Sequence, residues 1–600
     1  MDRSNPQQKQ KSLSAYKVVI AYDFGTTYSG AAYAFNNLSP AEVFDIQNWP
    51  QKDGNFYPKV PTVSVYPRTD QQQSNPFNRL TLSEWGHRAK KAMLKPGATK
   101  QNVLLSQFKL QLDDSLNRPP LENGLMPVQA VADYLSKLHQ YTLEELKRGF
   151  ANNYHSGTFR YCLTVPAVWS DKAKSTMRQA AIQAGIITPS DPPDRLLLVS
   201  EPEAAAIYCE KTMADQVQLK DKDRIMICDA GGGTVDLIVF QVHFTKDSRS
   251  DDLSAGRKNN RELKEVAQGI GESCGSVYLD HNFQELLKKK LGKKVMRKVT
   301  PREMYGMMEY FIGAIKPDFN GVDDHFVELP RSVRTKDLPA SVRNNDDDGC
   351  LDEGMLKLSG QELKDKVFDP VIDKVLSLID RQFKQIAGGK LNFLFLVGGF
   401  GSSKYLYQRV RKEFHGTKAK QIACPSERAA LAVVRGATYY GLNPRIVVSR
   451  VSRRAYGVVT KMAYEENIDP VSKRVVNAVG EVRCTDRFQT YIQKNEELPV
   501  DHCVSKQFRA FYGTRKVHDI SLYATENDTI PRYCDDPGVH RIGVVEVPIP
   551  KIPNMKKNET VNITIRMYFG RTEILMEAEF KTGEKHVFHC DFDAINNYGS

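Results

Sequence analysis

Short runs of apolar residues alternate with longer stretches of helical periodicity from Tyr16 to about Gly441. This alternation is typical of a mixed α/β protein. The pattern changes after Arg445, where short β-rich runs such as Ile542–Ile549 are separated by Asn, Asp, Pro and Gly turns. Closely spaced short strands with such turns predict an antiparallel β module over residues 446–595.

The α/β part contains an internal repeat. Lys17–Phe35 (KVVIAYDFGTTYSGAAYAF) and Arg224–Val242 (RIMICDAGGGTVDLIVFQV) share an apolar strand, an aspartate, a Gly/Thr turn and a second strand. A lone turn of this kind is weak evidence, but the same device in two places predicts a pair of hairpins with one shared task.

The composition of the two turns is suited to phosphate. Glycine lacks a Cβ, so backbone N–H groups can approach phosphate oxygens, and threonine hydroxyls add donors. The candidate phosphate-binding residues are Gly25, Thr26, Thr27, Gly231, Gly232, Gly233 and Thr234. Because carboxylates repel phosphate, we expect Asp23, Asp229 and Asp236 to hold Mg²⁺ or its waters, or to orient an attacking water.

A third glycine-rich turn follows the apolar run Leu391–Val397, which predicts a buried strand. Gly398, Gly399, Gly401, Ser402 and Ser403 then open a helix that we expect to begin at Lys404. Such a turn can seat a nucleoside or phosphate at a helix N-terminus. It is neither a Walker loop nor a dinucleotide fingerprint, because both spacings are missing.

These three elements, in this order, resemble the motifs of the actin, sugar-kinase and heat-shock ATPase superfamily. Tyr161–Asp171 (YCLTVPAVWSD) and Leu196–Tyr208 (LLLVSEPEAAAIY) are similar to segments of the seventy-kilodalton heat shock chaperones (DnaK-like). Ser449–Gly457 (SRVSRRAYG) resembles a segment of a divergent, chaperone-like branch of that family.

The resemblance implies a two-lobed, actin-like ATPase with duplicated ribonuclease H-like lobes, followed by a β-sandwich-like module that binds polypeptide. The last helix of the second lobe would return to the first. The implied divisions are a disordered tail at 1–15, lobe I at 16–205, lobe II at 206–445, the β module at 446–595 and a tail at 596–600.

The resemblance also implies roles for single residues. Asp23, Thr26, Thr27 and Tyr28 would line the phosphates, while Asp229 and Asp236 would organise the water shell of the metal. Glu201 would position or deprotonate the attacking water, although a carboxylate at a helix N-terminus is favoured there in any case. Lys109 would meet the γ-phosphoryl group, with a solvated lysine as the alternative. The nucleoside would be enclosed by Gly271, Glu272, Gly399, Ser402 and Ser426. Pro166 and Lys174 would relay nucleotide state between domains.

The sequence departs from the family pattern at several places. Ser426 replaces an expected acidic residue, and Lys174 stands where the family has an arginine. The linker Asn443–Arg454 is basic, whereas the family linker is apolar and acidic, so coupling to a J-domain cochaperone is in doubt. The chain ends at Ser600, soon after the β module, so we expect peptide capture without a helical lid.

Charge and composition narrow the classes of partner. The net charge is +12, and Leu287–Thr300 concentrates seven lysines and arginines. No aromatic residues interleave with them, so we expect a solvated helix face rather than a surface that binds nucleic acid. The acidic run Asn344–Gly349 is interpreted as a loop, since its contiguous aspartates lack the alternation of a calcium loop. No apolar run is long enough for a bilayer, and ten cysteines without CxxC spacing favour a reducing, cytoplasmic or nuclear location.

The leading hypothesis is an ATP-binding, slowly ATP-hydrolysing, chaperone-like switch that uses ATP/ADP and Mg²⁺. Its expected partners are a polypeptide client or a fixed protein partner, with a cochaperone or nucleotide-exchange factor, and no membrane. The alternatives are a nucleotide-binding scaffold without meaningful hydrolysis, a small-molecule kinase of the same superfamily and, least favoured, an actin-like filament former.

Overall fold

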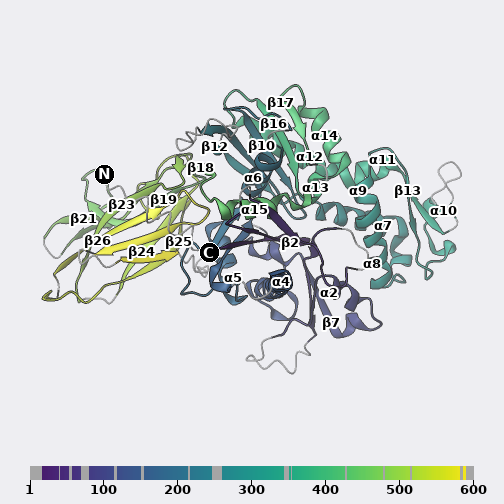
Figure 1. Ribbon diagram of the computed structural model, residues 1–600, viewed down its shortest axis with the longest axis horizontal. Coiled ribbons are helices and arrows are strands. Elements are labelled where there is room, and N and C mark those ends of the chain that lie inside the picture. The colour runs from purple at the N-terminus through teal and green to yellow at the C-terminus, as the bar shows by residue number, and fades with distance from the viewer. Residues whose placement is uncertain are drawn as a thin grey trace. The chain divides into compact units, whose positions relative to one another are not determined.

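The structure is a computed structural model (Figure 1). It describes residues 16–38, 41–52, 57–68, 80–113, 116, 118–150, 155–213, 216–245, 260–343, 351–352, 354–425, 429–477, 480–513, 517–557, 559–580 and 585–589. The expected tails, the acidic run Asn344–Gly349 and Ser426 lie outside these ranges.

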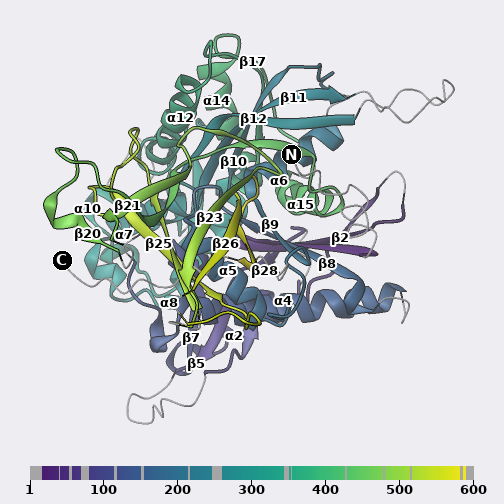
Figure 2. The same cartoon turned by 90° about the vertical axis from the view of Figure 1, so that its left-hand side faces the viewer.

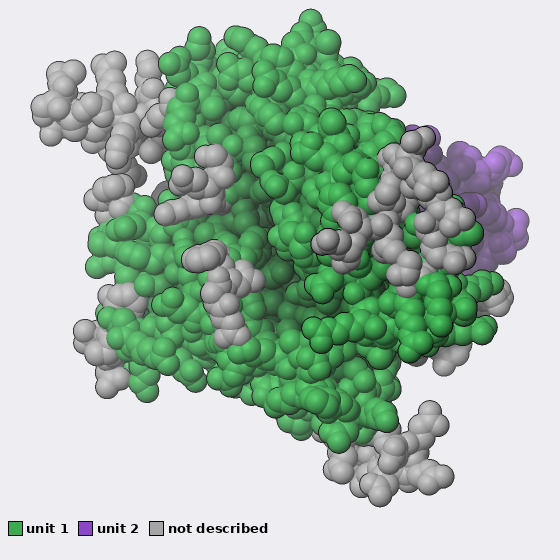
Figure 3. Space-filling view, turned by 90° about the vertical axis from the view of Figure 1, so that its right-hand side faces the viewer, with its two compact units in different colours: residues 1–168, 180–244, 269–444 green, residues 169–179, 245–268, 445–600 purple. Residues whose placement is uncertain are grey.

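The chain forms two compact units, which Figure 3 colours separately. Unit 1 lies within residues 1–168, 180–244 and 269–444, and unit 2 within residues 169–179, 245–268 and 445–600. The long strand β12 (Asn260–Glu272) runs from unit 2 into unit 1. Among the described helices, none combines the length and apolar character that crossing a bilayer requires.

The first part of unit 1 is built on one mixed sheet in the order β3-β2-β1-β8-β9, with β4 paired to β2. β1 runs antiparallel to β2 and parallel to β8, which in turn is parallel to β9. Every residue of β1 is buried, as expected for a central strand with both faces covered. The strands are β1 (Val18–Phe24), β2 (Tyr28–Phe35), β3 (Val43–Ile46), β4 (Val60–Pro61), β8 (Phe159–Val165) and β9 (Leu196–Ser200).

The second part of unit 1 repeats this local arrangement. β10 runs antiparallel to β11 and parallel to β16, which is parallel to β17. Each half therefore joins a hairpin to a parallel strand on the other side of its first strand, an arrangement compatible with a two-lobed, actin-like fold. The strands are β10 (Arg224–Ala230), β11 (Val235–Thr245), β16 (Leu391–Val397) and β17 (Ala419–Ala423).

Helices and two small sheets complete unit 1. The small sheets have the orders β6-β5-β7 and β13-β15-β14, with β5 (Val63–Pro67), β6 (Glu84–Trp85), β7 (Asn102–Ser106), β13 (His325–Glu328), β14 (Leu351–Asp352) and β15 (Met355–Leu358). The helices are α2 (Gly86–Met93), α3 (Ala98–Gln101), α4 (Pro127–Phe150), α6 (Glu201–Met213), α7 (Val277–Met296), α8 (Pro301–Tyr310), α9 (Lys316–Asp318), α10 (Ala340–Arg343), α11 (Gly360–Leu363), α12 (Asp369–Lys384), α13 (Gly398–Gly401), α14 (Lys404–Phe414) and α15 (Ala432–Leu442).

The basic run at the end of α7 is partly neutralised by acidic neighbours. Lys290 pairs with Glu362, and Lys294 and Lys298 both pair with Asp337. The next helix, α8, begins with a capping box at Thr300. The side chain of Thr300 accepts from the backbone N–H of Glu303, and the side chain of Glu303 accepts from the backbone N–H of Thr300.

Unit 2 contains two antiparallel sheets, in the orders β20-β21-β19-β24-β25 and β23-β26-β27-β28. Figure 2 labels β20, β21 and β25 of the first sheet and β23, β26 and β28 of the second. The β-rich run Ile542–Ile549 noted in the sequence overlaps β25. The strands of this part are β18 (Val447–Val451), β19 (Ala455–Ala463), β20 (Arg474–Val476), β21 (Val482–Ile492), β22 (Glu497–Pro499), β23 (Cys503–Phe511), β24 (Val517–Thr525), β25 (Val539–Pro548), β26 (Thr560–Tyr568), β27 (Leu575–Phe580) and β28 (Lys585–His589).

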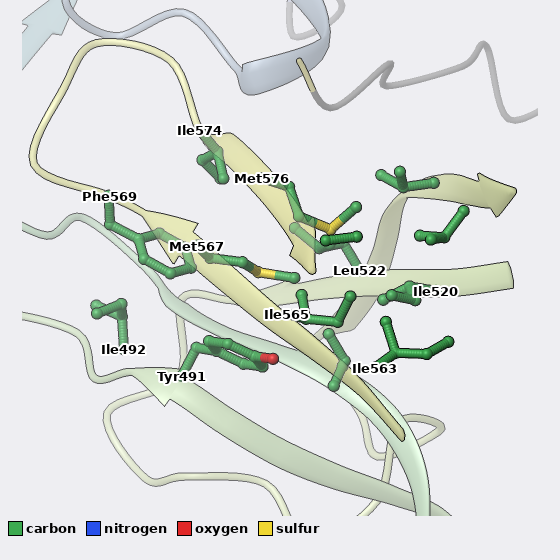
Figure 4. Packing of buried hydrophobic residues seen from close by; sticks show 14 of the residues in the cluster. Tyr491, Ile492, Ile520, Leu522, Ile563, Ile565, Met567, Phe569, Ile574 and Met576 are labelled. Carbon is green, nitrogen blue, oxygen red and sulfur yellow. The ribbon is translucent and has the colours of Figure 1, made fainter. Parts of the chain in front are cut away.

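The two sheets of unit 2 share one hydrophobic core (Figure 4). Ile520 and Leu522 of β24 contribute from one sheet, and Ile563, Ile565 and Met567 of β26 contribute from the other. The alternation of buried and half-buried positions along β26 is the period of two that a one-sided strand requires.

Unit 2 also includes a segment from the first third of the chain. The first turns of α5 (Asp171–Gln183) fall within it, and Arg178 donates two hydrogen bonds to Glu573 at 2.7 Å each. Tyr456 donates to Asp171 over 3.0 Å. Residues nearly four hundred positions apart are therefore joined by charged and polar contacts within one compact unit.

Candidate functional site

The turns of the two repeated hairpins lie against each other. A Cβ on Gly232 would stand 2.5 Å from Thr27 Oγ1, and a Cβ on Gly233 would stand 2.5 Å from Thr26 Oγ1. Real Cβ atoms do not approach other atoms so closely, so this contact requires glycine on the side of the second turn. The two turns that the sequence singled out therefore meet in space.

The second turn is fixed from one side by the start of α7. The backbone N–H groups of Gly275, Ser276 and Val277 donate to the carbonyls of residues 233, 231 and 232 over 3.1, 3.1 and 2.9 Å. These bonds use the carbonyls of the turn, whereas an anion would need its N–H groups. Within the turn itself, the N–H of Gly231 donates to the carbonyl of Thr234 over 3.0 Å.

Four carboxylates gather near these turns. Asp23 is the last residue but one of β1, and Glu201 is the first residue of α6. Asp229 and Asp236 stand opposite each other in the β10–β11 ladder. All four residues are at most 8% exposed. Burial raises the pKa of Asp229 well above its ordinary value, and the charges of Glu201, Asp236 and Asp23 add to the effect. Burial likewise raises the pKa of Glu201 to about 7, while Lys109 opposes the shift.

Two buried lysines accompany these carboxylates. Lys59 Nζ lies 2.5 Å from Asp23 Oδ2, and Thr164 donates to the other oxygen of that carboxylate over 3.1 Å. Lys109 is 2% exposed and is bonded to Glu201, so it is not a solvated lysine. Burial lowers the pKa of Lys59, but the neighbouring Asp23 outweighs this effect and the pKa stays above its ordinary value.

Sequence reasoning missed Lys59. It precedes the two-residue strand β4, which pairs with β2 beside the first hairpin turn. No motif surrounds it, and Asp23 lies 36 positions earlier in the chain. The only signal in the sequence was a lysine directly before an apolar run, which is too common to single out a site.

The charge of the cluster suits a divalent cation. The raised pKa values of Asp229 and Glu201 show that two lysines offset the charge of four carboxylates only in part. Within the described ranges, however, no group of three or more His, Cys, Asp or Glu side chains is arranged to hold a metal ion directly. Asp23 already accepts bonds from Lys59 and Thr164. The residues therefore fit a cation held through water and phosphate oxygens rather than through a full set of protein ligands.

The third glycine-rich turn lies beside the second hairpin. Gly398 has a φ of 84°, and a Cβ there would stand 2.5 Å from both Asp229 Oδ1 and the carbonyl oxygen of residue 230. Gly399 comes close to the Tyr57 hydroxyl, which would lie 3.3 Å from an added Cβ. Ser402 donates to the carbonyl of Gly398 over 3.1 Å, so its hydroxyl closes the turn. The expected start of the following helix at Lys404 is confirmed.

The remaining predicted residues are placed less centrally. A Cβ on Gly271 would lie 2.8 Å from Asp236 Oδ1, which sets Gly271 beside the cluster. Glu272 is instead paired with Arg381 in an exposed contact. The ring of Tyr28 packs on Tyr57 with centroids 4.7 Å apart.

The two relay candidates fall in different units. Pro166 directly follows β8 in unit 1, and Lys174 lies in the part of α5 that belongs to unit 2. Lys174 Nζ lies 3.8 Å from Asp171 Oδ1, and burial lowers the pKa of Lys174.

No protein-family model matches the chain. Among curated proteins, it is 26% identical to the heat shock 70 kDa protein 12A of Mus musculus, over 98% of this chain and 92% of that protein. The human protein of the same name is also 26% identical, over 95% of this chain and 90% of its own length. Human heat shock 70 kDa protein 12B is 24% identical, over 99% of this chain and 93% of that protein. This similarity over nearly the full length confirms the resemblance that the motifs indicated: the chain is similar to proteins named heat shock 70 kDa proteins.

Proposed function

We propose that the chain is an ATP-binding, slowly ATP-hydrolysing, chaperone-like protein whose nucleotide site is the meeting point of the two hairpin turns. The observation that carries this proposal is the contact of Thr26 and Thr27 with Gly233 and Gly232, surrounded by buried carboxylates and two lysines. Phosphoryl transfer needs positioned donors and positive charge more than covalent chemistry.

Each group of the cluster has a task in this proposal. The glycine and threonine donors of both turns bind phosphate oxygens, and the third glycine-rich turn, which lies beside Asp229, contacts the nucleoside. Asp229 and Asp236 would hold Mg²⁺ through water, and the ion would supply positive charge to the phosphates. Glu201 orients the attacking water, and Lys109 faces the γ-phosphoryl group. Glu201 and Lys109 are bonded to each other, so phosphate must compete for the lysine, which favours slow turnover.

The role of unit 2 in this proposal is contact with polypeptide. The similarity to proteins named heat shock 70 kDa proteins spans this part of the chain and favours a chaperone-type interaction. A cochaperone or nucleotide-exchange factor is a further partner class, and the cytoplasm or nucleus is the proposed location.

Asp229→Asn tests the proposal. We expect the wild type to bind ADP and ATP and to release phosphate slowly without any acceptor, and the variant to turn over at least about tenfold more slowly, since a group that acts on the transition state is lost. Calorimetry measures binding, and a phosphate-release assay measures turnover. Asp365→Asn, which changes a carboxylate 53% exposed, is the matched control and should leave both unchanged. A wild-type protein without affinity for either nucleotide would contradict the proposal.

A nucleotide-binding scaffold is the second candidate, because Lys109 is engaged by Glu201. The two functions differ in a single-turnover experiment with protein in excess over ATP. Bound ATP that stays intact for hours would favour the scaffold. Phosphate released without an acceptor would favour hydrolysis and would also argue against a small-molecule kinase.

A further inference from the structure

Lys59 crosses the first hairpin at the level of its aspartate. Gly30 stands opposite Asp23 in the β1–β2 ladder, and a Cβ on Gly30 would lie 3.3 Å from Lys59 Cγ and 3.4 Å from Lys59 Cε. The methylene groups of the lysine therefore lie over the space that any other residue at position 30 would fill. Its ammonium group then reaches Asp23.

The backbone that carries Lys59 is fastened to the same turn. The N–H of Thr62 donates to the carbonyl of Thr27 over 2.8 Å, and the hydroxyls of Thr62 and Ser29 lie 2.8 Å apart. Ser29 and Thr62 are fully buried, and Lys59 is 8% exposed. The ammonium group is therefore held in place by a strand rather than carried on a mobile loop.

A structural ion pair alone is a weak account of this arrangement. Burying a lysine and an aspartate costs desolvation energy that their attraction seldom exceeds, so such pairs rarely exist for stability. The Lys59–Asp23 pair lies next to the first hairpin turn, whose Thr26 and Thr27 face the second hairpin. An ammonium group has three N–H donors, and the bond to Asp23 uses one of them.

We propose that Lys59 is a built-in cation of the phosphate site, which offsets the charge of Asp23 and donates to a phosphate oxygen, so that nucleoside diphosphates are held with little dependence on a divalent ion. This inference rests on the proposed function. A carboxylate next to the turn would otherwise repel phosphate and require a metal ion to offset it. At the first hairpin, Lys59 offsets the charge of Asp23 whether or not a metal ion is bound.

The test is a titration of the full chain with a fluorescent ADP analogue, in Mg²⁺ and in EDTA. For the wild type we expect the affinity to fall by less than about tenfold when Mg²⁺ is removed, a change below roughly 1.4 kcal/mol. Lys59→Met keeps an unbranched side chain that is one atom shorter and removes its charge. In EDTA this variant should bind at least about a hundredfold more weakly than the wild type, since both cations are then missing. Lys52→Met, which changes a half-buried lysine that donates to the carbonyl of Gln47, should behave as the wild type.

The outcomes separate the two proposals. If the wild type binds the analogue in Mg²⁺ but its affinity falls by more than about tenfold in EDTA, the proposed role of Lys59 is wrong. The proposed function would still stand in that case. A wild type that binds in neither condition overturns the proposed function itself. If Lys59→Met does not fold, the ratio of the wild-type affinities in Mg²⁺ and in EDTA still decides between the outcomes. Lys59→Arg adds to this test, because it keeps the charge and should keep binding that resists EDTA.

Discussion

At the scale of single residues, burial decides which side chains can carry charge. His139 of α4 lies in the core of unit 1, where the Tyr22 hydroxyl is 2.7 Å from its Nδ1 and the ring of Tyr161 packs edge-on at 5.4 Å. Burial lowers the pKa of His139 to about 4, and the charge of Arg195 adds to the effect. The neutral imidazole is therefore part of the folded core.

This shift predicts a pH dependence of stability. The unfolded chain takes up a proton on His139 below about pH 6.5, whereas the folded chain resists it down to about pH 4. The stability that neutral His139 contributes is present above about pH 6.5 and is lost as the pH falls toward 4, by up to roughly 3 kcal/mol. His139→Gln keeps a hydrogen-bonding side chain but does not titrate. Melting temperatures measured from pH 7 to pH 4.5 should therefore fall less steeply for this variant than for the wild type. Parallel curves would contradict the shift.

At the scale of secondary-structure elements, close helix packing joins distant parts of unit 1. A Cβ on Gly436 of α15 would lie 1.7 Å from the carbonyl oxygen of Ala204 in α6. A Cβ on Gly441 at the end of the same helix would lie 2.4 Å from Val19 of β1. α6 begins at Glu201 and β1 carries Asp23, so this helix supports two elements that supply carboxylates to the candidate site.

Gly436→Ala tests this packing. The added methyl group forces α6 and α15 apart, and we expect a loss of about 2 kcal/mol or more in the free energy of unfolding. Gly306→Ala in α8 is the control, because nothing lies within 4 Å of a Cβ there. That change should be neutral or stabilising by up to about 1 kcal/mol, since alanine is the better helix former. Thermal unfolding measures both, and equal effects of the two changes would refute the role of the close contact.

At the scale of the whole molecule, unit 2 is not a continuous stretch of sequence. Residues 169–179 belong to it together with residues 445–600, and the paired groups Arg178 and Glu573 are 10% and 17% exposed. A bidentate guanidinium–carboxylate pair of this kind gains from geometry as well as charge. Removing either side chain takes away both hydrogen bonds of this pair.

A double-mutant cycle on Arg178→Met and Glu573→Gln measures this coupling. We expect each single change to destabilise unit 2, and the double change to cost less than the sum, with a coupling of about 1–3 kcal/mol. The exposed pair Lys404 and Asp318, at 66% and 71% exposure, is the comparison and should show a coupling below about 1 kcal/mol. Additive effects at Arg178 and Glu573 would show that the two residues do not depend on each other.

Local patterns accounted for much of the fold and for part of the candidate site. Both hairpins, the strand before the third turn and the helix that begins at Lys404 occupy the predicted positions. The contact between the hairpin turns agrees with the prediction that they act together. The roles of Asp229, Glu201 and the other predicted site residues in binding or catalysis stay predictions.

The sequence by itself determined the strands, the turns and the helix starts, because periodicity, glycine content and capping act over a few neighbouring residues. Only the tertiary structure decided that Lys59 reaches Asp23, that Lys109 bonds to Glu201 and that Arg178 meets Glu573. These partners are far apart in the chain. Their pairing depends on how the elements pack, and the pKa of a carboxylate such as Glu201 depends on that packing as well.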